Sequence, residues 1–559
     1  MRQKLDKTTP VLDEFDYIVA GAGSAGCVVA ARLSKDPDLR VLLLEAGPED
    51  DSWTIRMPGA LRLNFLGGRY NWAFHTEAEP HLGGRRLYQP RGRGLGGSSS
   101  INGMTYVRGH ALDYERWVTE GATGWSYGEV LPYFKRIESH EDGEDPWHGD
   151  AGPVRIARMS ALHPINEAFL EAGEQAGYAR GNDLNGYRQE GFGRFDVNVD
   201  RGVRASTAHA FLHPVRKRAN LAVRTDCHVT RLIMERERAV GVEYLSGNRC
   251  MKVRANREVV LAAGAFGSPQ ILMLSGIGPA GALHALGIDP MVDLPGVGKN
   301  LHDHIEIHVQ HACSQPIAMN HYMTVAGKAR IGIQWFLFRS GIGAFNHSHV
   351  GAFICSAAGV QHPDIQYHFW PYWFEGWDPP PGRHGYCFGV GTLRPRSRGE
   401  VTLRSTDPTD TPCILLNALA DEDDLRDLRA CLTLTRELAA QKAFDPFRGR
   451  EAAPGPDVRD GDAVDDWIRA HAASAYHSCG TCRMGTGDDA VVDAHTRVRG
   501  VEGLRIVDAS IMPSITSGNL NAPVMMLADK ASDLILGYDP LPPSNASRYV
   551  DADHAHRQR

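Results

Sequence analysis

A glycine-rich turn near the start of the chain constrains its fold more than any other feature. Residues 21–26 read Gly-Ala-Gly-Ser-Ala-Gly and lie between a short apolar segment and a run of small residues. The order of strand, GxGxxG turn and helix is typical of a βαβ unit that binds a dinucleotide. Gly21 permits the tight turn, Gly23 lets the backbone approach a pyrophosphate, and Gly26 packs the helix on the strand. The turn therefore predicts a dinucleotide at the positive end of the helix.

A carboxylate at the end of the next predicted strand supports this interpretation. Residues 41–44, Val-Leu-Leu-Leu, are apolar enough for a buried strand, and Glu45 follows them, 19 residues after Gly26. In dinucleotide-binding folds a carboxylate at this place accepts hydrogen bonds from ribose hydroxyls. Together the two features predict a Rossmann unit, but they do not distinguish NAD from FAD.

The bulk properties exclude several classes of protein. A chain of 559 residues is too long for one hydrophobic core, which favours two domains. Its formal net charge of -7 disfavours nucleic acid as a partner, because phosphate binding needs a basic surface. The sequence shows no secretory signal and no apolar run of about 18 residues. We expect a cytoplasmic protein without a transmembrane span, and peripheral contact with the inner membrane stays open.

The ten cysteines are scattered along the chain. Cys479 and Cys482 form a single CxxC, which is compatible with a redox pair or half of a zinc site. No second CxxC accompanies it, and thiols stay reduced in the cytoplasm. We therefore predict structural thiols and no metal site.

Three longer motifs carry a family resemblance. Residues 92–104 (GRGLGGSSSINGM) and 264–278 (GAFGSPQILMLSGIG) resemble the two signatures of the glucose–methanol–choline (GMC) oxidoreductases. Residues 476–485 (YHSCGTCRMG), followed by 507–510 and 518–523, resemble the C-terminal active-site segment of that family. The resemblance implies an α/β protein, with a Rossmann-type FAD-binding domain and an α+β substrate domain that contains a mixed or antiparallel sheet.

The same resemblance implies how the chain divides. The FAD-binding domain is expected to comprise residues 14–157, 219–304 and 474–540, and the substrate-binding domain residues 158–218 and 305–473. Residues 1–13 and 541–559 are poor in apolar side chains, so we expect loosely ordered tails.

The cofactor that the resemblance implies is FAD, bound in an extended form. Some family members attach FAD through a histidine of the first signature, but Ile101 occupies that position here and predicts non-covalent binding. The residues expected to contact FAD are Gly21, Gly23, Ser24, Ala25, Gly26, Glu45, Ala46, Arg93, Gly96, Gly97, Ser98, Asn102, Gly103, Met104, Val229, Ala263, Gly264, Asp508, Ala509, Asn521 and Ala522.

The expected reaction is the oxidation of a primary alcohol to the aldehyde. A base must take the hydroxyl proton while the flavin N5 accepts a hydride, and a neutral histidine suits the role of base. His477 matches the active-site histidine of the family, and Asn521 matches its usual partner, which gives the oxygen a second hydrogen bond. The expected electron acceptor is oxygen, a quinone or another carrier.

The substrate is less constrained by the sequence. Residues 69–77, 106–117 and 298–306 resemble the choline dehydrogenases within the family, although these stretches also recur in bacterial dehydrogenases of other primary alcohols. Glu306 matches a carboxylate that faces the trimethylammonium group, so choline or a related alcohol is the leading hypothesis. His304 matches another position near the pocket. Candidates for an aromatic cage around the cation are Tyr476, Trp370, Trp373 and Trp335.

Several alternatives stay open at this point. The aromatic segment 369–378 departs from the choline dehydrogenases and suits a bulkier, neutral alcohol, whether aliphatic, aromatic or a polyol. Proteins of this fold also include FAD-containing lyases and light-driven decarboxylases, and a flavin scaffold without activity is a further alternative. The His477–Asn521 pair favours oxidation over the photoenzyme and the scaffold.

Overall fold

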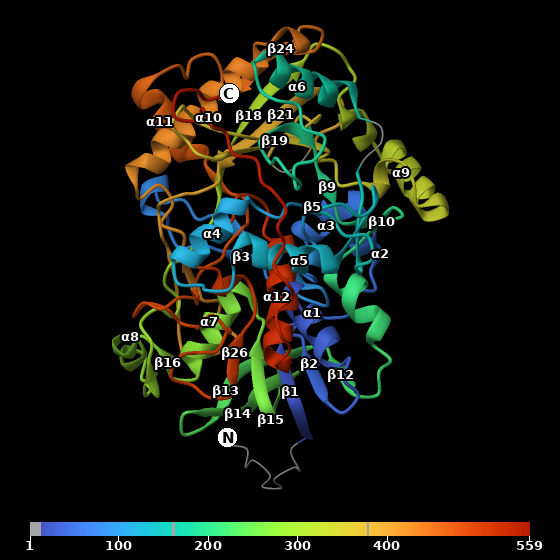
Figure 1. Ribbon diagram of the computed structural model, residues 1–559. Helices are drawn as coiled ribbons and strands as arrows, with labels where there is room; N and C mark the ends of the chain where they lie inside the picture. The colour runs from blue at the N-terminus through green and yellow to red at the C-terminus, as the bar shows by residue number, and fades with distance from the viewer. Residues whose placement is uncertain (1–12, 159–161, 377–378) are drawn as a thin grey trace, which may run out of the picture.

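Two seven-stranded sheets organise the molecule (Figure 1). The computed structural model describes residues 13–158, 162–376 and 379–559. Each sheet has its own large hydrophobic core. The predicted combination of a Rossmann-type domain with an α+β domain is confirmed.

The first sheet, in the lower half of Figure 1, holds the predicted βαβ unit. Its parallel strands are β12 (Leu221–Arg224), β2 (Val41–Leu44), β1 (Asp13–Ala20), β15 (Arg249–Leu261) and β26 (Leu504–Ile506), and β14 (Arg238–Ser246) and β13 (Cys227–Glu235) continue it antiparallel. All four residues of β2 are buried, as expected for a parallel strand covered on both faces. Helices α1 (Ser24–Leu33) and α12 (Asn521–Leu536) pack against each other beside this sheet.

The second sheet is antiparallel and lies in the upper half of Figure 1. Its order is β24 (Arg448–Ala453), β18 (Ile305–Cys313), β21 (Gly385–Thr392), β20 (Ile365–Trp370), β19 (Val350–Ile354) and β8 (Gly191–Arg194), with β25 (Ala473–Ser474) beside β18. Helices α6 (Pro164–Gln175) and α10 (Glu422–Ala439) contribute their apolar residues to its core.

The remaining elements are short or connect the two sheets. The helices are α2 (Trp53–Arg56), α3 (Leu61–Phe65), α4 (Ala111–Thr119), α5 (Tyr127–Ile137), α7 (Gly264–Leu274), α8 (Ala280–Ala285), α9 (Val325–Phe338) and α11 (Gly461–His471). The strands are β3 (Phe74–His75), β4 (Tyr88–Gln89), β5 (Thr105–Tyr106), β6 (Glu138–His140), β7 (Val154–Ile156), β9 (Asp196–Val197), β10 (Val199–Asp200), β11 (Val203–Arg204), β16 (Ile277–Gly278), β17 (Val292–Asp293), β22 (Glu400–Thr402) and β23 (Cys413–Leu415).

One segment that we predicted in the substrate domain packs with the core of the first sheet instead. Residues 208–212 were expected in the substrate domain, but they pack against α1, and Leu212 is buried in the core of the first sheet. The other predicted domain boundaries stay predictions.

The C-terminal segment 541–559 is bound to the rest of the protein, so the expectation of a loose tail is wrong there. The Trp147 indole N–H donates to the Ser547 carbonyl at 2.9 Å. At the far end, the Arg559 guanidinium forms a two-pronged ion pair with Glu437 at 2.7 and 2.9 Å. Polar contacts with residues distant in sequence hold this segment, and Leu541 and Ala546 pack against the core of the first sheet. Residues 1–12 of the other predicted tail lie outside the described residues.

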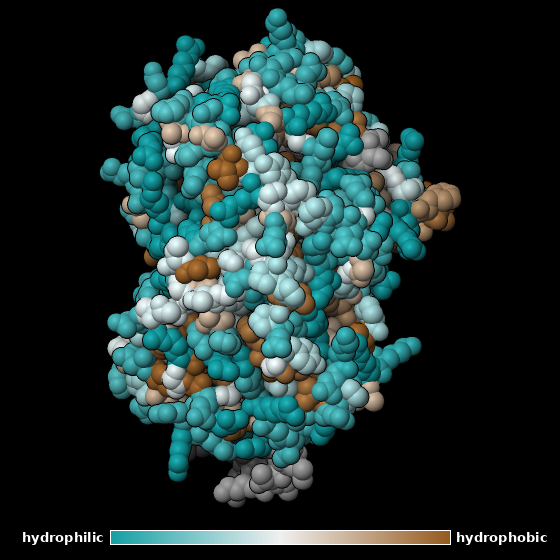
Figure 2. All heavy atoms as spheres, viewed as in Figure 1, coloured by the Kyte–Doolittle hydropathy of each residue, from teal (hydrophilic) through white to brown (hydrophobic). Residues whose placement is uncertain are grey.

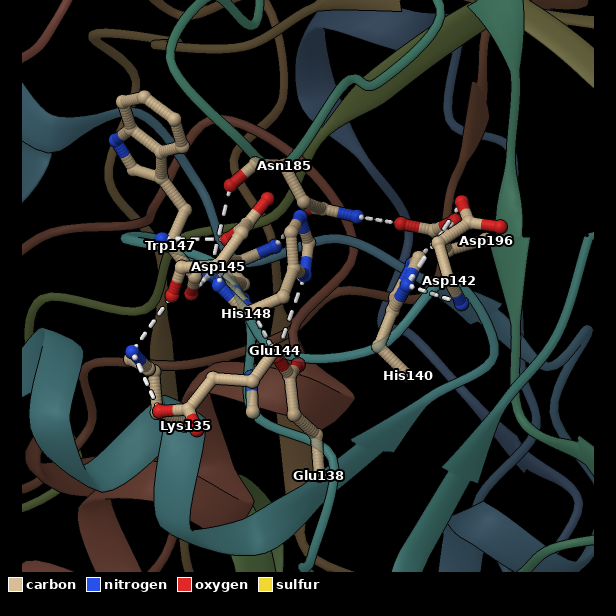
Figure 3. Close-up of polar contacts among 12 residues, drawn as sticks. Lys135, Glu138, His140, Asp142, Glu144, Asp145, Trp147, His148, Asn185 and Asp196 are labelled. Atoms are coloured by element: carbon tan, nitrogen blue, oxygen red, sulfur yellow. Dashed lines mark hydrogen bonds and ion pairs between the residues drawn. The ribbon is translucent and has the colours of Figure 1, made fainter.

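A buried polar network lies next to this segment (Figure 3). The Arg108 and Glu138 side chains form an ion pair, and neither is more than 1% exposed. His148 lies between two carboxylates, 3.2 Å from Glu138 and 2.9 Å from Asp183. Burial alone would lower the pKa of His148, but the hydrogen bonds to Asp183 and Glu138 outweigh it and raise the pKa to about 9. The two carboxylates therefore favour the protonated form of His148 in the folded protein, against the opposing charge of Arg108.

We predict that this network makes stability fall at alkaline pH. Because the pKa of His148 rises from 6.5 to about 9 on folding, its contribution is complete below pH 6.5 and is lost as pH rises through 9. That contribution is at most about 3 kcal/mol. Melting temperatures of the wild type and His148→Gln should therefore differ most near pH 6 and converge by pH 10. The exposed His321→Gln is the control, and a difference that does not depend on pH would contradict the prediction.

Candidate active site

A single cavity of about 790 Å³ is lined by both sheets and contains most of the predicted site. Its walls reach from Ala20 and Leu44 of the first sheet to Glu306 and Trp370 of the second. The predicted cofactor residues that line it are Gly21, Gly23, Ser24, Ala25, Glu45, Ala46, Gly97, Ser98, Asn102, Gly103, Met104, Val229, Ala263, Gly264, Asp508, Ala509 and Asn521.

Four predicted cofactor residues support the cavity wall from behind. A side chain at Gly26 would lie 1.8 Å from the Gly21 carbonyl oxygen, so this glycine allows helix and strand to pack, as predicted. The Gly96 N–H donates to the Ala22 carbonyl, and the Arg93 guanidinium donates to the Ala46 carbonyl. Ala522 is buried in the first core.

The N-termini of three helices line this cavity. α1 begins after Gly23, α7 begins after Ala263, and α12 begins at Asn521. The Ser24 hydroxyl donates to the Asn521 side-chain oxygen at 2.7 Å and so joins the ends of α1 and α12. Helix N-termini stabilise anions, so this end of the cavity suits a pyrophosphate.

Close backbone packing explains the glycines of the first signature. Gly97 has a φ of +50°, and a β-carbon there would lie 2.6 Å from the α-carbon of Gly23. The two glycine loops therefore approach each other closely, which leaves the wall between them without side chains. Such a wall admits the flat rings and phosphates of a dinucleotide.

Glu45 lines the cavity beside the glycine turn and is held by backbone amides. Its carboxylate accepts hydrogen bonds from the N–H groups of Ala22, Gly47 and Gly94 at 2.8–2.9 Å. Burial raises its pKa, and these hydrogen bonds act in the opposite direction. The carboxylate is thereby fixed in the cavity wall, and its predicted contact with a ribose stays a prediction.

Asp508 fixes the start of α7, one of these three helices. It accepts hydrogen bonds from the Gly264 N–H at 2.8 Å and the Ser268 hydroxyl at 2.6 Å. Ile101 lines the same compartment, and its hydrocarbon side chain cannot form a covalent bond to a flavin. The glycine walls, the helix N-termini and the two carboxylates together fit an extended, non-covalently bound FAD.

His477 lies in the cavity between a second histidine and an asparagine. Its Nδ1 is 2.9 Å from the Nδ1 of His304, and its Nε2 is 3.0 Å from the Nδ2 of Asn519. The Nε2 of His304 is 3.0 Å from the carbonyl oxygen of Leu393. Burial lowers the pKa of both rings, that of His304 to about 4 and that of His477 well below its usual range.

These contacts determine which nitrogen of His477 carries its proton. A carbonyl oxygen only accepts, so the Nε2 of His304 must donate to Leu393. Because a neutral imidazole has one N–H, the Nδ1 of His304 must then accept from the Nδ1–H of His477. The Nε2 of His477 is left with a lone pair, which accepts the hydrogen bond from the Nδ2 of Asn519.

The structure places Asn519 beside His477, and not Asn521 as the sequence predicted. The Nδ2 of Asn519 donates to the Nε2 of His477, and its side-chain oxygen accepts from Gln366 at 3.2 Å. Asn521 is the first residue of α12, so its side chain lies at the helix end with Ser24. The two asparagines thus serve different parts of the cavity.

A buried carboxylate that sequence reasoning missed holds the His477 loop. Asp303 accepts from the backbone N–H of His477 at 2.7 Å and from the Ser474 hydroxyl at 2.5 Å. The Arg91 guanidinium donates to the Tyr476 carbonyl at 3.0 Å. Tyr476 has a φ of +66°, an uncommon conformation for a tyrosine, which the surrounding bonds must enforce.

Glu306 lines the same cavity as His477. Its carboxylate is buried and is 3.0 Å from the Nε2 of His308. Burial opposes ionisation of Glu306, but the hydrogen bond to His308 outweighs it and lowers the pKa, so the carboxylate is charged. Tyr476 and Trp370, two of the four predicted cage aromatics, line the same cavity.

Three other predicted substrate residues lie away from this compartment. Trp335 packs in a small separate core, where its indole N–H donates to the Gly202 carbonyl. Trp373 is not part of the cavity lining, and Arg383 lies over its ring. His304 lies behind His477, so it contacts the base and does not line the cavity. Aromatic residues that the sequence did not single out, Phe65 and Phe374, take places in the wall.

Cys479 and Cys482 are buried free thiols. They follow His477 closely in the chain and belong to the core of the first sheet. The prediction that they are structural agrees with this position.

Comparisons with known proteins agree with this geometry. Two family models, both described as GMC oxidoreductase, match residues 15–306 and 395–528. The oxygen-dependent choline dehydrogenase of Brucella canis is 48% identical over 96% of this chain and 98% of its own length. The mitochondrial choline dehydrogenase of Homo sapiens is 50% identical over 94% of this chain and 90% of its own length.

Solved structures with a similar fold cover most of the chain. The pyridoxine 4-oxidase from Mesorbium loti has a TM-score of 0.84 and 34% identity, covering 94% of this chain and 100% of its own. A variant of the formate oxidase from Aspergillus oryzae RIB40 has a TM-score of 0.88 and 26% identity, covering 94% of this chain and 98% of its own.

We predict that Asn519 and Asn521 are separable by mutation. Because Asn519 faces His477, Asn519→Ala should retain FAD and slow flavin reduction, by ~10²–10³-fold if it stabilises developing charge. Because Asn521 joins α1 to α12, Asn521→Ala should instead weaken FAD retention. Flavin absorbance after gel filtration and stopped-flow reduction without oxygen measure the two effects. Equal losses in both variants would contradict the assignment.

Proposed function

Since the chain belongs to the GMC oxidoreductase family and is an FAD-dependent alcohol oxidoreductase, we propose that it oxidises choline, or a closely related cationic primary alcohol, to the aldehyde. The observation that carries this proposal is the buried, charged Glu306 carboxylate in the same compartment as His477. The names of the curated relatives support the same substrate.

The residues around His477 supply the acid–base part of the reaction. FAD, when bound, supplies the acceptor for the hydride. The Nε2 lone pair of His477 takes the hydroxyl proton, since its ring is neutral and its other nitrogen is already protonated. The Asn519 amide donates a hydrogen bond to the same oxygen as negative charge develops there. Both groups line the cavity and are 3.0 Å apart, so an alcohol oxygen that contacts both replaces the hydrogen bond between them.

Glu306 binds the cationic end of the substrate. A charge pair gains strength when water is excluded, and Glu306 is only 7% exposed. Tyr476 and Trp370 line the same compartment and present aromatic faces that favour a quaternary ammonium group. The Phe65 ring packs on Tyr476 at a centroid distance of 5.2 Å and steadies that wall.

A neutral, bulkier alcohol is the second candidate. Trp370, Tyr372 and Phe374 all line the cavity, and the Phe374 ring is 6.0 Å from Trp370 and 5.8 Å from Tyr372. This aromatic wall offers apolar area to an alcohol without a charge.

We also propose peripheral contact with an anionic membrane through α9. In the described part of the chain, no helix combines the length and apolar character needed to cross a bilayer. Val325, Ile333, Phe336, Leu337 and Phe338 of α9 are 51–88% exposed, and Figure 2 shows hydrophobic atoms gathered at this edge of the molecule. The Trp53 ring lies 5.7 Å from Phe336 and extends the surface toward Leu63 and Leu66.

The positive charge of α9 favours an anionic lipid surface as the partner of its exposed apolar side chains. α9 contains Lys328 and Arg330 and no acidic residue, and Arg339 follows it. Exposed aliphatic and aromatic side chains with flanking cations are typical of helices that lie in the interface of an anionic bilayer. α3 carries Leu61 and Arg62 of the cavity wall, so the patch lies next to the cavity. A lipid-soluble quinone is therefore an acceptor that this arrangement suits.

We predict a preference for charge in the substrate. Without oxygen, choline should bleach the flavin, and its neutral isostere 3,3-dimethylbutan-1-ol should do so only at much higher concentration. Glu306→Gln should raise the KM for choline far more than the KM for the isostere. Similar effects on both alcohols would remove Glu306 from substrate binding, and bleaching by neutral alcohols with choline inert would favour the second candidate.

We predict that α9 mediates vesicle binding. The wild type should sediment with vesicles that contain phosphatidylglycerol, and Leu337→Glu combined with Phe338→Glu should abolish this. The matched control is Met251→Glu combined with Met291→Glu. Both methionines are exposed, and Met251 lies on β15 of the first sheet. Sedimentation that is unchanged by the α9 substitutions would overturn the assignment, as would absence of binding by the wild type.

A further inference from the structure

We propose that Gln310 is a positioning residue through which the active site selects alcohols by shape. It fixes the backbone of Phe374, so that the Phe374 and Trp370 rings form a corner in the cavity wall. This corner recognises a compact, branched head group, such as a trimethylammonium or a tert-butyl group. The inference rests on the proposed function and deepens it, since the corner lines the same cavity as Glu306.

The register of the second sheet brings Gln310 to this corner. Glu306, His308 and Gln310 are alternate residues of β18, so their side chains point to one face of the sheet, and all three line the cavity. Gln310 pairs with Cys387 of β21, and Cys387 pairs in turn with Trp370 of β20. Cys387 and Trp370 line the cavity as well. The corner therefore begins on the sheet face that carries Glu306.

A glycine makes room for the Trp370 ring on this face. A β-carbon at Gly389 would lie 2.4 Å from the indole of Trp370, so the ring covers this glycine. Gly389 pairs with His308 on one side and with His368 on the other. The Trp370 ring stacks on the His368 ring at 5.9 Å, with 12° between the planes. It thus extends along the sheet face toward the side chains of the neighbouring row.

Two hydrogen bonds join the Gln310 side chain to the backbone of Phe374. The Gln310 Nε2 donates to the Phe374 carbonyl at 3.1 Å, and the Phe374 N–H donates to the Gln310 Oε1 at 2.8 Å. Gln310 is buried, so water is a poor substitute for either bond. The Phe374 ring then lies 6.0 Å from the Trp370 ring, with 90° between the planes. Gln310 therefore sets the angle of the corner.

A second buried amide holds the residue before Phe374. The Asn320 Nδ2 donates to the carbonyls of Trp373 and Pro380 at 2.8 and 3.0 Å, and its Oδ1 accepts from the Trp373 N–H at 2.8 Å. Residues 371–374 belong to no helix or strand. Side-chain amides thus supply the backbone of Trp373 and Phe374 with the hydrogen bonds that a sheet partner would give.

The corner and Glu306 recognise different properties of the substrate. Two perpendicular rings enclose a branched head group on two sides, and they offer apolar contact to a tert-butyl group or a cation–π contact to a trimethylammonium group. The Glu306 carboxylate attracts only the charged head group. Shape is therefore read by the corner that Gln310 holds, and charge by Glu306.

The test compares two variants. Gln310→Met keeps the size of the side chain but loses both hydrogen bonds, and Phe374→Ala removes the ring itself. In each, the KM for choline and the KM for 3,3-dimethylbutan-1-ol should rise together, by roughly tenfold. Flavin reduction at saturating alcohol should stay within about threefold of the wild type, because the corner does not contact the reacting atoms. An unchanged KM for both compact alcohols in Gln310→Met would overturn the inference.

A double variant shows whether Gln310 acts through Phe374. If it does, adding Gln310→Met to Phe374→Ala should change the KM little further, because there is no ring left to position. Fully additive effects would show that Gln310 contacts the substrate itself, and would overturn its positioning role. Gln441→Met is the matched control, because Gln441 also donates to a backbone carbonyl, that of Glu437 at 3.1 Å, but lies outside the cavity lining. Retained FAD and the melting temperature show that each variant is folded.

The outcomes separate this inference from the proposed function. If Glu306→Gln impairs choline selectively, but Gln310→Met and Phe374→Ala leave both KM values unchanged, the inference is wrong and the proposed function stands. If choline is inert and 3,3-dimethylbutan-1-ol is oxidised, the proposed function is wrong, and the same variants test the corner with the neutral alcohol. If neither compact alcohol reduces the flavin, both are wrong.

Discussion

The hydrogen bond from His304 to the Leu393 carbonyl is the contact on which the base of this site depends. It fixes the proton of His304, which in turn fixes the proton of His477 on Nδ1 and leaves the Nε2 lone pair facing Asn519. Leu393 directly follows β21, and His304 directly precedes β18, so two neighbouring strands of the second sheet set this chain of bonds. Asn519, in contrast, belongs to the turn before α12 of the first lobe. The second sheet therefore orients the ring of His477 through His304, while Asn519 reaches it from the turn before α12.

The cavity has opposite electrostatic character at its two ends. Three helix N-termini make one end suitable for an anion, and Glu306 makes the other end suitable for a cation. A cofactor with a pyrophosphate and a substrate with an ammonium group each meet the complementary end. His477 lies between the two ends with a neutral ring, since a cationic base would oppose the substrate and could not take its proton.

The sequence predicted most of the cofactor end, because turns, glycines and helix starts are local patterns. It failed where the answer depended on the position of a helix start or on distant partners. Asn519 and Asn521 are two residues apart in one motif, and only the start of α12 at Asn521 shows which one faces His477. Trp335 and Trp370 both lie in aromatic segments, yet one packs in a separate core and the other lines the cavity. The segment 541–559 has no apolar pattern, and its partner Glu437 lies more than a hundred residues away.

The His477 loop shows why the site needs support that no motif reveals. Tyr476 adopts a backbone conformation that costs energy, and such a conformation persists only when neighbouring contacts enforce it. Asp303 provides two of these contacts and Arg91 a third, although burying a carboxylate is itself unfavourable and raises the pKa of Asp303. The strained backbone of Tyr476 and the buried Asp303 are both unfavourable for stability, but together they hold the base in a fixed position. Because Asp303 directly precedes His304, the residue that holds the backbone of His477 and the residue that orients its ring are neighbours in the chain.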